Sequence, residues 1–225
     1  MDILDLIFPK QCLECKKRGE YICETCLNKL PSIKQTCPVC QRASIDGFTH
    51  PKCLKSQSLD GLMALWPYRG VIRRAIISLK YKYVREISNE LSTLVLRKAK
   101  DMFIFGDKDL ILTTVPIFWI RKNIRGYNQV DGVAETLAER FSLNFYPDLI
   151  KRNKLKDPQV KLSKEERTKN VQGVFLLNLK YRSLIINHKI LIIDDVYTTG
   201  STLKETGKVL KRNGAKEVWG LVLAK

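Results

Sequence analysis

The sequence predicts an α/β fold, in which a mostly parallel sheet is flanked by helices, preceded by a small cysteine-rich module. Two observations carry this prediction. Short apolar runs that are typical of buried strands alternate with amphipathic helical patterns between residues 57 and 225. All seven cysteines fall before residue 54, mostly in pairs separated by two residues. We therefore expect two domains, a double zinc-ribbon module over residues 1–56 and an α/β domain over residues 57–225.

The charge balance of the chain is strongly basic. It has 40 Lys and Arg residues against 23 Asp and Glu residues, a formal net charge of +17 and a pI near 9.6. Such a balance is typical of proteins that bind an anionic partner, such as nucleic acid, a nucleotide or an acidic membrane surface. A uniformly basic surface without such a partner is the alternative, and composition alone does not separate the two.

The chain shows no transmembrane or targeting signal. It contains no apolar run of 18 residues or more. Its first ten residues carry two acidic side chains and lack the basic segment of a signal peptide, so we expect a short amphipathic helix that ends near Pro9. An odd number of cysteines, confined to one end and paired as C-x-x-C, is typical of metal binding in a reducing compartment. We therefore expect a cytoplasmic protein.

The cysteine spacing predicts two zinc sites. The first consists of two C-x-x-C pairs seven residues apart, with the ligands Cys12, Cys15, Cys23 and Cys26. The second repeats the pattern over nine residues, with histidine in the third position, and has the ligands Cys37, Cys40, His50 and Cys53. Thiolate and imidazole groups are the usual ligands of tetrahedral structural Zn²⁺. A degenerate second site without metal is the alternative, so we expect one or two zinc ions per chain.

The α/β domain begins with a strand that we expect within Leu59–Tyr68. Apolar residues at helical spacing follow, from Val71 to Leu79 and again from Ile87 to Val95, and predict two helices. A second buried strand is expected over Leu110–Val115, because a short apolar run there is closed by Pro116. These elements form the first half of the expected sheet.

A basic loop follows the strand that ends at Val115. Its charged residues are Arg121, Lys122 and Arg125. Because ligands of α/β sheets bind at the carboxyl ends of the strands, we expect these side chains to meet either a pyrophosphate group or the phosphates of DNA. A solvent loop that contacts nothing is the alternative. A helix is then expected from Val130 to Phe141, a polar flap over residues 149–174 that leads into a strand, and a final strand over residues 216–225.

The segment Ile190–Thr202 combines a strand, two carboxylates and a hydroxyl-rich loop. Ile190–Ile193 has the pattern of a buried strand, Asp194 and Asp195 follow it, and the next helix ends at Gly214. The loop residues are Thr198, Thr199, Gly200, Ser201 and Thr202. Hydroxyl groups and a helix N-terminus suit a phosphate, and paired carboxylates suit sugar hydroxyls or Mg²⁺. A ligand with a 5′-phosphate and a ribose diol would engage both.

This segment closely resembles the phosphoribosyl-pyrophosphate (PRPP) signature of type I phosphoribosyltransferases. The resemblance implies that Asp194 and Asp195 hold the ribose hydroxyls, with Mg²⁺ when PRPP is bound, and that Thr198–Thr202 hold the 5′-phosphate. An ordinary strand tip capped by Asp and Thr is one alternative. A P-loop NTPase is another, and we reject it because the sequence lacks the motif G-x-x-x-x-G-K-[ST].

The whole chain is similar to the ComF family of late-competence proteins, of the ComFC type. Beyond the zinc pairs and the PRPP signature, the resemblance rests on Leu79–Tyr81, Arg125–Gln129 and the run from Gln159 to Phe175. It implies a type I phosphoribosyltransferase-like domain behind a zinc module, acting on incoming single-stranded DNA in natural transformation. It also implies two partners, the ComFA helicase-like ATPase and the recombination mediator DprA. The sequence departs from the family at His50, where cysteine is usual.

Two functional hypotheses follow. The first is a DNA-handling protein that keeps a PRPP-type pocket with little or no catalysis, which a positive charge spread along the whole chain favours. The second is an active Mg²⁺-dependent phosphoribosyltransferase that uses PRPP, which the intact carboxylates and hydroxyl loop favour. The acceptor base and a general base are not identifiable in the sequence.

Overall fold

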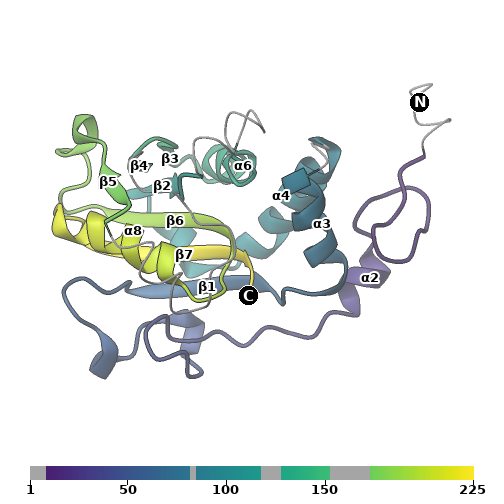
Figure 1. The fold of residues 1–225 in the computed structure, drawn as a ribbon, viewed down its shortest axis with the longest axis horizontal. Helices are drawn as coiled ribbons and strands as arrows, with labels where there is room; N and C mark the ends of the chain where they lie inside the picture. The colour runs from purple at the N-terminus through teal and green to yellow at the C-terminus, as the bar shows by residue number, and fades with distance from the viewer. Residues whose placement is uncertain (1–8, 82–84, 118–127, 153–172) are drawn as a thin grey trace.

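The protein is described by a computed structural model that covers residues 9–81, 85–117, 128–152 and 173–225 (Figure 1). The helix expected before Pro9 lies outside the described residues. No helix among the described segments combines the length and the apolar composition needed to cross a membrane. The described residues comprise the two cysteine-rich segments and the α/β domain.

A five-stranded parallel sheet forms the centre of the α/β domain, in the order β1–β7–β6–β2–β3. Its strands are β1 (Gly61–Trp66), β2 (Leu110–Thr114), β3 (Asn144–Phe145), β6 (Lys189–Val196) and β7 (Glu217–Ala224). The central strands β6 and β7 are largely apolar. This composition suits strands whose side chains are buried on both faces of the sheet. The predicted α/β fold with a mostly parallel sheet is confirmed.

Helices cover both faces of this sheet. They are α3 (Gly70–Tyr81), α4 (Arg85–Ala99), α6 (Asp131–Phe141) and α8 (Ser201–Arg212), while the short helix α2 (Glu24–Asn28) belongs to the first cysteine-rich segment. The helices α3, α4 and α6 share one core with one face of the sheet, through residues such as Leu91 and Leu137. Helix α8 buries Leu203 and Leu210 in the core of the other face. Short 3₁₀ helices span Ile45–Gly47, Pro51–Cys53, Phe103–Gly106 and Leu179–Tyr181.

A small antiparallel pair of strands packs beside α8. β4 (Ile150–Arg152) pairs with β5 (Phe175–Leu177), and Ile150 and Phe175 are buried in the core that contains α8. The prediction of a polar flap over residues 149–174 is therefore wrong at its start, where the chain forms a strand. Three residues with one apolar side chain give no readable periodicity, which is why the sequence did not reveal β4. The remainder of that flap, residues 153–172, lies outside the described residues.

Strand β6 is longer than the apolar run that predicted it. It pairs with β7 as far as Val196, so that Asp194 and Asp195 belong to the strand instead of following it. Successive side chains of the strand enter opposite cores: Ile192 packs on the side of α8 and Ile193 on the side of α3, α4 and α6. The two carboxylates consequently start from opposite faces of the sheet.

The first cysteine-rich segment packs against α3 and α4. Cys12 and Cys26 are buried in the core to which both helices contribute. The carboxylate of Glu90 on α4 accepts hydrogen bonds from the backbone N–H groups of Tyr21 at 2.9 Å and Ile22 at 3.0 Å. This segment therefore depends on the α/β domain for part of its core.

The second cysteine-rich segment runs along the outer edge of β1. The side-chain amide of Gln35 donates to the carbonyl of Ala64 and accepts from its N–H, both at 2.9 Å. The N–H of Thr49 donates to the carbonyl of Asp60 at 2.8 Å. These bonds satisfy backbone groups at a sheet edge that would otherwise be open to other strands. The two cysteine-rich segments thus contact different parts of the α/β domain (Figure 1).

Candidate functional site

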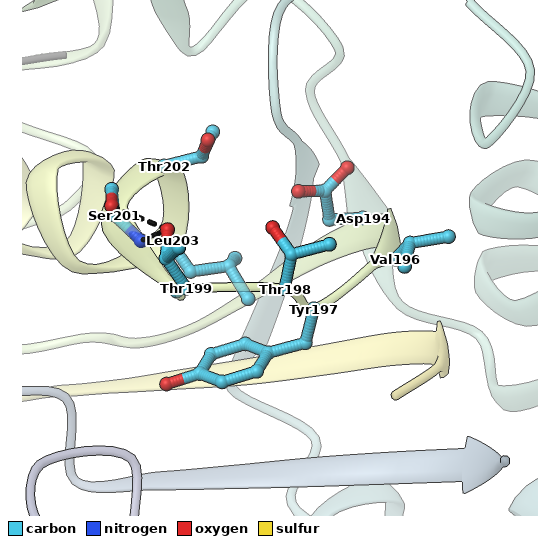
Figure 2. A pocket seen from close by; sticks show the side chains of 9 residues that line it. Asp194, Val196, Tyr197, Thr198, Thr199, Ser201, Thr202 and Leu203 are labelled. Atoms are coloured by element: carbon cyan, nitrogen blue, oxygen red, sulfur yellow. Dashed lines mark hydrogen bonds between the residues drawn. The ribbon is translucent and has the colours of Figure 1, made fainter. Parts of the chain in front are cut away.

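A polar pocket lies at the carboxyl end of β6, where the chain turns into α8 (Figure 2). The predicted site residues that line it are Asp194, Thr198, Thr199, Gly200, Ser201 and Thr202. Figure 2 shows the oxygen atoms of Asp194 and Thr198 on one side of the loop and the ring of Tyr197 on the other. The position agrees with the general location of ligand sites in parallel α/β sheets.

The hydroxyl groups of the loop surround the N-terminus of α8. Thr199 Oγ1 and Ser201 Oγ are 2.6 Å apart, and the N–H of Ser201 donates to Thr199 Oγ1 at 3.3 Å. The first turn of a helix presents backbone N–H groups and the positive end of the helix dipole. Hydroxyl donors, N–H donors and a positive dipole are the features that bind a phosphate group. The pocket therefore has the chemistry of a phosphate site.

Gly200 is required by the shape of this loop. Its φ is +72°, in the left-handed region that side chains disfavour. A Cβ atom at this position would overlap the ring and hydroxyl of Tyr197. The loop thus packs so closely on Tyr197 that only glycine fits.

We expect Gly200→Ala to weaken PRPP binding about tenfold or more and to lower the free energy of unfolding by about 1–3 kcal/mol, because the strained backbone must move away from Tyr197. Isothermal titration with PRPP and Mg²⁺ and urea unfolding measure the two effects. Gly106→Ala is the matched control, since nothing lies within 4 Å of the added Cβ there. Equal PRPP affinity in both variants would contradict the proposed role of the loop.

Asp194 and Asp195 differ in their relation to the pocket. Both are half-buried, and the N–H of Asp195 donates to Asp194 Oδ1 at 2.8 Å. Asp194 lines the pocket together with the hydroxyl loop, whereas Asp195 does not. The alternation of side chains along a strand explains this difference. That both carboxylates hold a ribose stays a prediction, and of the two only Asp194 lines the pocket.

The carboxyl end of β2 lies beside that of β6 and carries a polar network. Thr114, the last residue of β2, donates its hydroxyl to Asp131 Oδ1 at 2.7 Å. The buried side chain of Asn128 donates to Thr114 Oγ1 at 3.3 Å and to the carbonyl of Val115 at 3.1 Å. These bonds anchor both ends of the connection between β2 and α6. The predicted pyrophosphate or DNA residues of that connection, Arg121, Lys122 and Arg125, lie outside the described residues.

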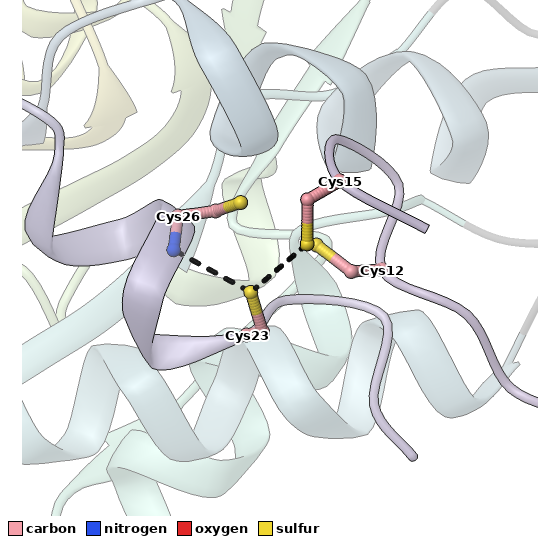
Figure 3. Close-up of side chains that lie close together, drawn as sticks. All are labelled: Cys12, Cys15, Cys23 and Cys26. Carbon is pink, nitrogen blue, oxygen red and sulfur yellow. Dashed lines mark hydrogen bonds between the residues drawn. The ribbon is translucent and has the colours of Figure 1, made fainter. Parts of the chain in front are cut away.

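The first four predicted zinc ligands form one compact cluster (Figure 3). The sulfur atoms of Cys12, Cys15, Cys23 and Cys26 all lie within 4.8 Å of one another. Those of Cys15 and Cys23 are 3.6 Å apart. Tetrahedral zinc with bonds of about 2.3 Å to sulfur places its ligands about 3.8 Å apart, so the four thiols fit this metal.

The electrostatics of this cluster also fit a cation. Burial opposes ionisation of Cys12, but hydrogen bonds from the backbone of Cys15, Cys23 and Glu14 outweigh it and lower the pKa of Cys12 to about 6. Burial and the neighbouring sulfur atoms raise the pKa of Cys26 to about 12. The protein alone thus stabilises one thiolate, at Cys12, whereas four adjacent thiolates repel one another and require a metal ion to stay ionised.

The second cluster contains three cysteines and one histidine. The ligand atoms of Cys37, Cys40, His50 and Cys53 lie within 4.8 Å of one another. Cys40 Sγ and His50 Nδ1 are 3.3 Å apart, and His50 Nε2 lies 3.0 Å from the carbonyl oxygen of Ala43. Because a carbonyl can only accept, Nε2 carries the proton and Nδ1 is left to bind the metal. The geometry therefore accommodates histidine as the fourth ligand.

Sequence reasoning missed Tyr197, which lines the pocket together with the apolar residues Val196 and Leu203. Its side chain is buried, and its hydroxyl donates to the carbonyl of Pro38 at 3.2 Å. Burial, followed by the charge of the nearby Cys37, raises the pKa of Tyr197 to about 12, so the phenol stays protonated at neutral pH. The only signal in the sequence is an aromatic residue within a run of small hydroxyl residues.

Comparison with protein families agrees with both parts of this description. Residues 130–225 match the phosphoribosyl transferase domain family, and residues 3–54 match the double zinc ribbon domain family. The chain thus carries a double zinc ribbon domain, and its two ligand clusters support structural zinc.

Three relatives are similar over most of the chain. Competence protein F of Haemophilus influenzae is 30% identical over 76% of this chain and 77% of its own. The DNA utilization protein YhgH of Escherichia coli O157:H7 is 30% identical over 89% of both chains. Competence protein ComFC of Bacillus subtilis is 26% identical over 88% of this chain and 81% of its own.

Among solved structures, adenine phosphoribosyltransferase from Leishmania tarentolae is 17% identical, with a TM-score of 0.39 over 68% of this chain and 61% of that chain. A likeness at this level adds nothing on function.

Proposed function

This chain belongs to the family of Competence protein F and ComFC, and from that membership we propose that it is a late-competence protein of natural transformation. In this proposal it handles incoming single-stranded DNA in the cytoplasm through a basic phosphoribosyltransferase-like domain that keeps a PRPP-type pocket. One observation supports the pocket above all others. Asp194 and the loop Thr198–Thr202 gather at the carboxyl end of β6 and the N-terminus of α8.

The loop is proposed to bind the 5′-phosphate of PRPP. Its hydroxyls and the first N–H groups of α8 donate hydrogen bonds to the phosphate oxygens, and Asp194 accepts hydrogen bonds from the ribose hydroxyls. Carboxylate oxygens are also the ligands that Mg²⁺ prefers, and this ion, when bound, would neutralise the charge of the pyrophosphate. Arg121, Lys122 and Arg125 are proposed to contact the pyrophosphate or DNA.

The basic character of the chain supports DNA as a second ligand. The formal net charge is +17, and the basic residues are spread along the chain instead of being confined to the pocket. Exposed basic side chains occur on the first ribbon, at Lys16, Lys17 and Arg18, and on α3, at Arg73. Such side chains bind the phosphate backbone of nucleic acids without regard to sequence.

We expect the affinity for single-stranded DNA to fall steeply with salt, because each phosphate contact releases a counterion. With about five contacts the slope of log K against log salt is about −3.5, which is about a hundredfold loss between 50 and 200 mM salt. Fluorescence anisotropy with a labelled oligonucleotide measures this slope. An affinity that is independent of salt would argue against phosphate contacts as the basis of binding.

An active Mg²⁺-dependent phosphoribosyltransferase that uses PRPP is the second candidate. The presence of a carboxylate and the complete hydroxyl loop in one pocket favours it. In this reaction the C1–O bond of PRPP breaks, pyrophosphate leaves with the electron pair, and a nucleophile forms a bond to the oxocarbenium-like C1. Release of pyrophosphate from PRPP in the presence of single-stranded DNA or free bases distinguishes this candidate from a protein that only binds PRPP.

Protein partners are a further part of the proposal. By family resemblance they are the ComFA helicase-like ATPase and the recombination mediator DprA. Biolayer interferometry with the purified proteins, with and without single-stranded DNA, tests each interaction. If neither protein binds under both conditions, this part of the proposal fails while the ligand proposals stand.

Calorimetric titration of PRPP with Mg²⁺, with and without single-stranded DNA, tests the two-ligand proposal most directly. Binding of PRPP whose affinity changes with DNA supports a pocket that is coupled to DNA handling. Salt-sensitive DNA binding without any PRPP binding would remove the pocket from the proposal and leave the domain as a DNA-binding scaffold.

A further inference from the structure

Tyr197 links the hydroxyl loop Thr198–Thr202, the proposed phosphate loop, to the second zinc ribbon. Its side chain is only 3% exposed, and its backbone lies between the carboxylates of β6 and the hydroxyl loop. Its hydroxyl donates to the carbonyl of Pro38 at 3.2 Å. Pro38 lies inside the C-x-x-C pair of the second cluster, directly after Cys37.

The position of the Pro38 carbonyl depends on the fold of its ribbon. The N–H of Cys37 donates to the carbonyl of Arg42 at 3.0 Å, and the N–H of Gln41 donates to the carbonyl of Cys37 at 2.9 Å. These bonds close a tight turn around the C-x-x-C pair. A zinc ion held by Cys37 and Cys40 would lock the same turn, because small zinc ribbons gain much of their stability from the metal.

A second contact joins the same ribbon to Tyr197. The ammonium group of Lys225 lies 5.2 Å from the centre of the Tyr197 ring and contacts the hydroxyl of Thr36. The N–H of Tyr197 in turn donates to the carbonyl of Ala224 at 2.9 Å. Tyr197 is therefore fixed at two places. Its hydroxyl bonds to the second ribbon, while its backbone bonds to the end of β7 and its ring contacts Lys225.

The phosphate loop packs directly against this ring. A Cβ at Gly200 would overlap the Tyr197 ring and hydroxyl, so the backbone of the loop lies directly on the side chain. A displacement of the ring would therefore move Gly200 and the donors on either side of it. A site whose donors are held in place before binding gains affinity, because less order must be created on binding.

We propose that Tyr197 is a positioning residue that couples zinc binding by the second ribbon to phosphate binding by the loop Thr198–Thr202. This inference rests on the proposed function for its ligand, PRPP. It assigns to the second ribbon a part in the phosphate site in addition to covering the edge of β1. By linkage, PRPP must then also raise the affinity of the second ribbon for zinc by the same factor.

The first test does not require PRPP binding. Tyr197→Phe removes only the hydroxyl, with its bonds to the carbonyl of Pro38 and to the side chain of Gln41. Tyr181→Phe is the control, because it makes the same chemical change at a hydroxyl that donates to the carboxylate of Asp148 at 2.6 Å, away from the pocket. We expect Tyr197→Phe to speed amide hydrogen exchange in residues 198–202 and to speed zinc release from the second cluster about fivefold, as one hydrogen bond predicts. Release from the first cluster, measured in the same molecule with a colorimetric chelator, should not change.

The second test measures the coupling itself. His50→Ala opens the second cluster and is expected to lower PRPP affinity about tenfold, and Tyr197→Phe about fivefold to tenfold. The double variant should lose no more than His50→Ala alone, because both changes break the same connection. His50→Cys should restore zinc and PRPP affinity, since it repeats the four-cysteine pattern of the first cluster. Tyr181→Phe should leave PRPP affinity unchanged.

The outcomes separate the two proposals. If the wild-type protein binds no PRPP, the proposed pocket function fails, while hydrogen exchange and zinc release still decide the coupling. Additive losses in the double variant, or unchanged exchange and zinc release in Tyr197→Phe, would overturn the coupling even if PRPP binds. If His50→Ala does not fold, Tyr197→Phe and His50→Cys decide the question by themselves.

Discussion

Replacing Cys12 and Cys15 by serine is expected to release the zinc of the first ribbon and to unfold its residues. Cys12 is 0% exposed and lies in the core shared with α3 and α4, so loss of the metal also disturbs this core. Because zinc binding contributes much of the folding free energy of such modules, we expect a loss of more than about 4 kcal/mol in the free energy of unfolding.

Elemental analysis and thermal unfolding check this prediction. The zinc content should fall by one ion per chain, and proteolysis should become rapid in the segment before α2. Glu24→Gln is the control in the same module: its exposed ion pair with Arg97 is worth no more than about 1 kcal/mol, and zinc should remain. Retention of all metal by the serine variant would show that the ligand assignment is wrong.

Replacing Asp194 and Asp195 by asparagine is expected to abolish PRPP binding while DNA binding remains. Hydrogen bonds to a charged group contribute about 1.5–3 kcal/mol each, so the loss of two carboxylates corresponds to about a hundredfold or greater loss of PRPP affinity. Because Asp194 lines the pocket and Asp195 does not, the single variant Asp194→Asn should show the larger loss.

Calorimetry with PRPP and Mg²⁺ and anisotropy with single-stranded DNA measure the two affinities side by side. Asp109→Asn makes the same chemical change at an exposed position before β2, at the amino ends of the strands and away from the pocket, and should leave PRPP binding unchanged. An equal loss of PRPP and DNA affinity in the double variant would contradict separate sites for the two ligands.

The helices of the α/β domain and the sheet, apart from its two-residue edge strand β3, were predictable from the sequence, because their patterns are long and regular. The apolar run Ile190–Ile193 and the helical spacing from Val130 to Phe141 both correspond to elements of the structure. The short strand β4 was not predictable, because its burial depends on pairing with β5 across more than 20 residues of chain. The end of β6 was placed too early for a related reason: its last pairs are made with β7, and polar residues there break the apolar run.

The zinc clusters and the phosphate loop are sites that could be predicted from residues close together in the sequence. Consecutive ligands within one ribbon are separated by two to nine residues, so the spacing of Cys12, Cys15 and their partners already restricts them to one cluster. The hydroxyl residues of the loop are likewise neighbours in the chain and surround a single helix N-terminus. In both cases the chemistry could be inferred from the sequence, because chain connectivity alone holds the groups near one another.

The sequence by itself therefore determined the fold class, the positions of the main strands and helices, and the neighbouring residues that form the two ligand clusters and the hydroxyl loop. Only the tertiary structure decided that Asp194 and not Asp195 lines the pocket, that Ala43 orients the imidazole of His50, and that Tyr197 bonds to Pro38, 159 residues away. These relations depend on which face of a strand a side chain takes and on contacts between distant segments. Such contacts arise when the chain buries its apolar surface as a whole, and no local pattern of residues records them.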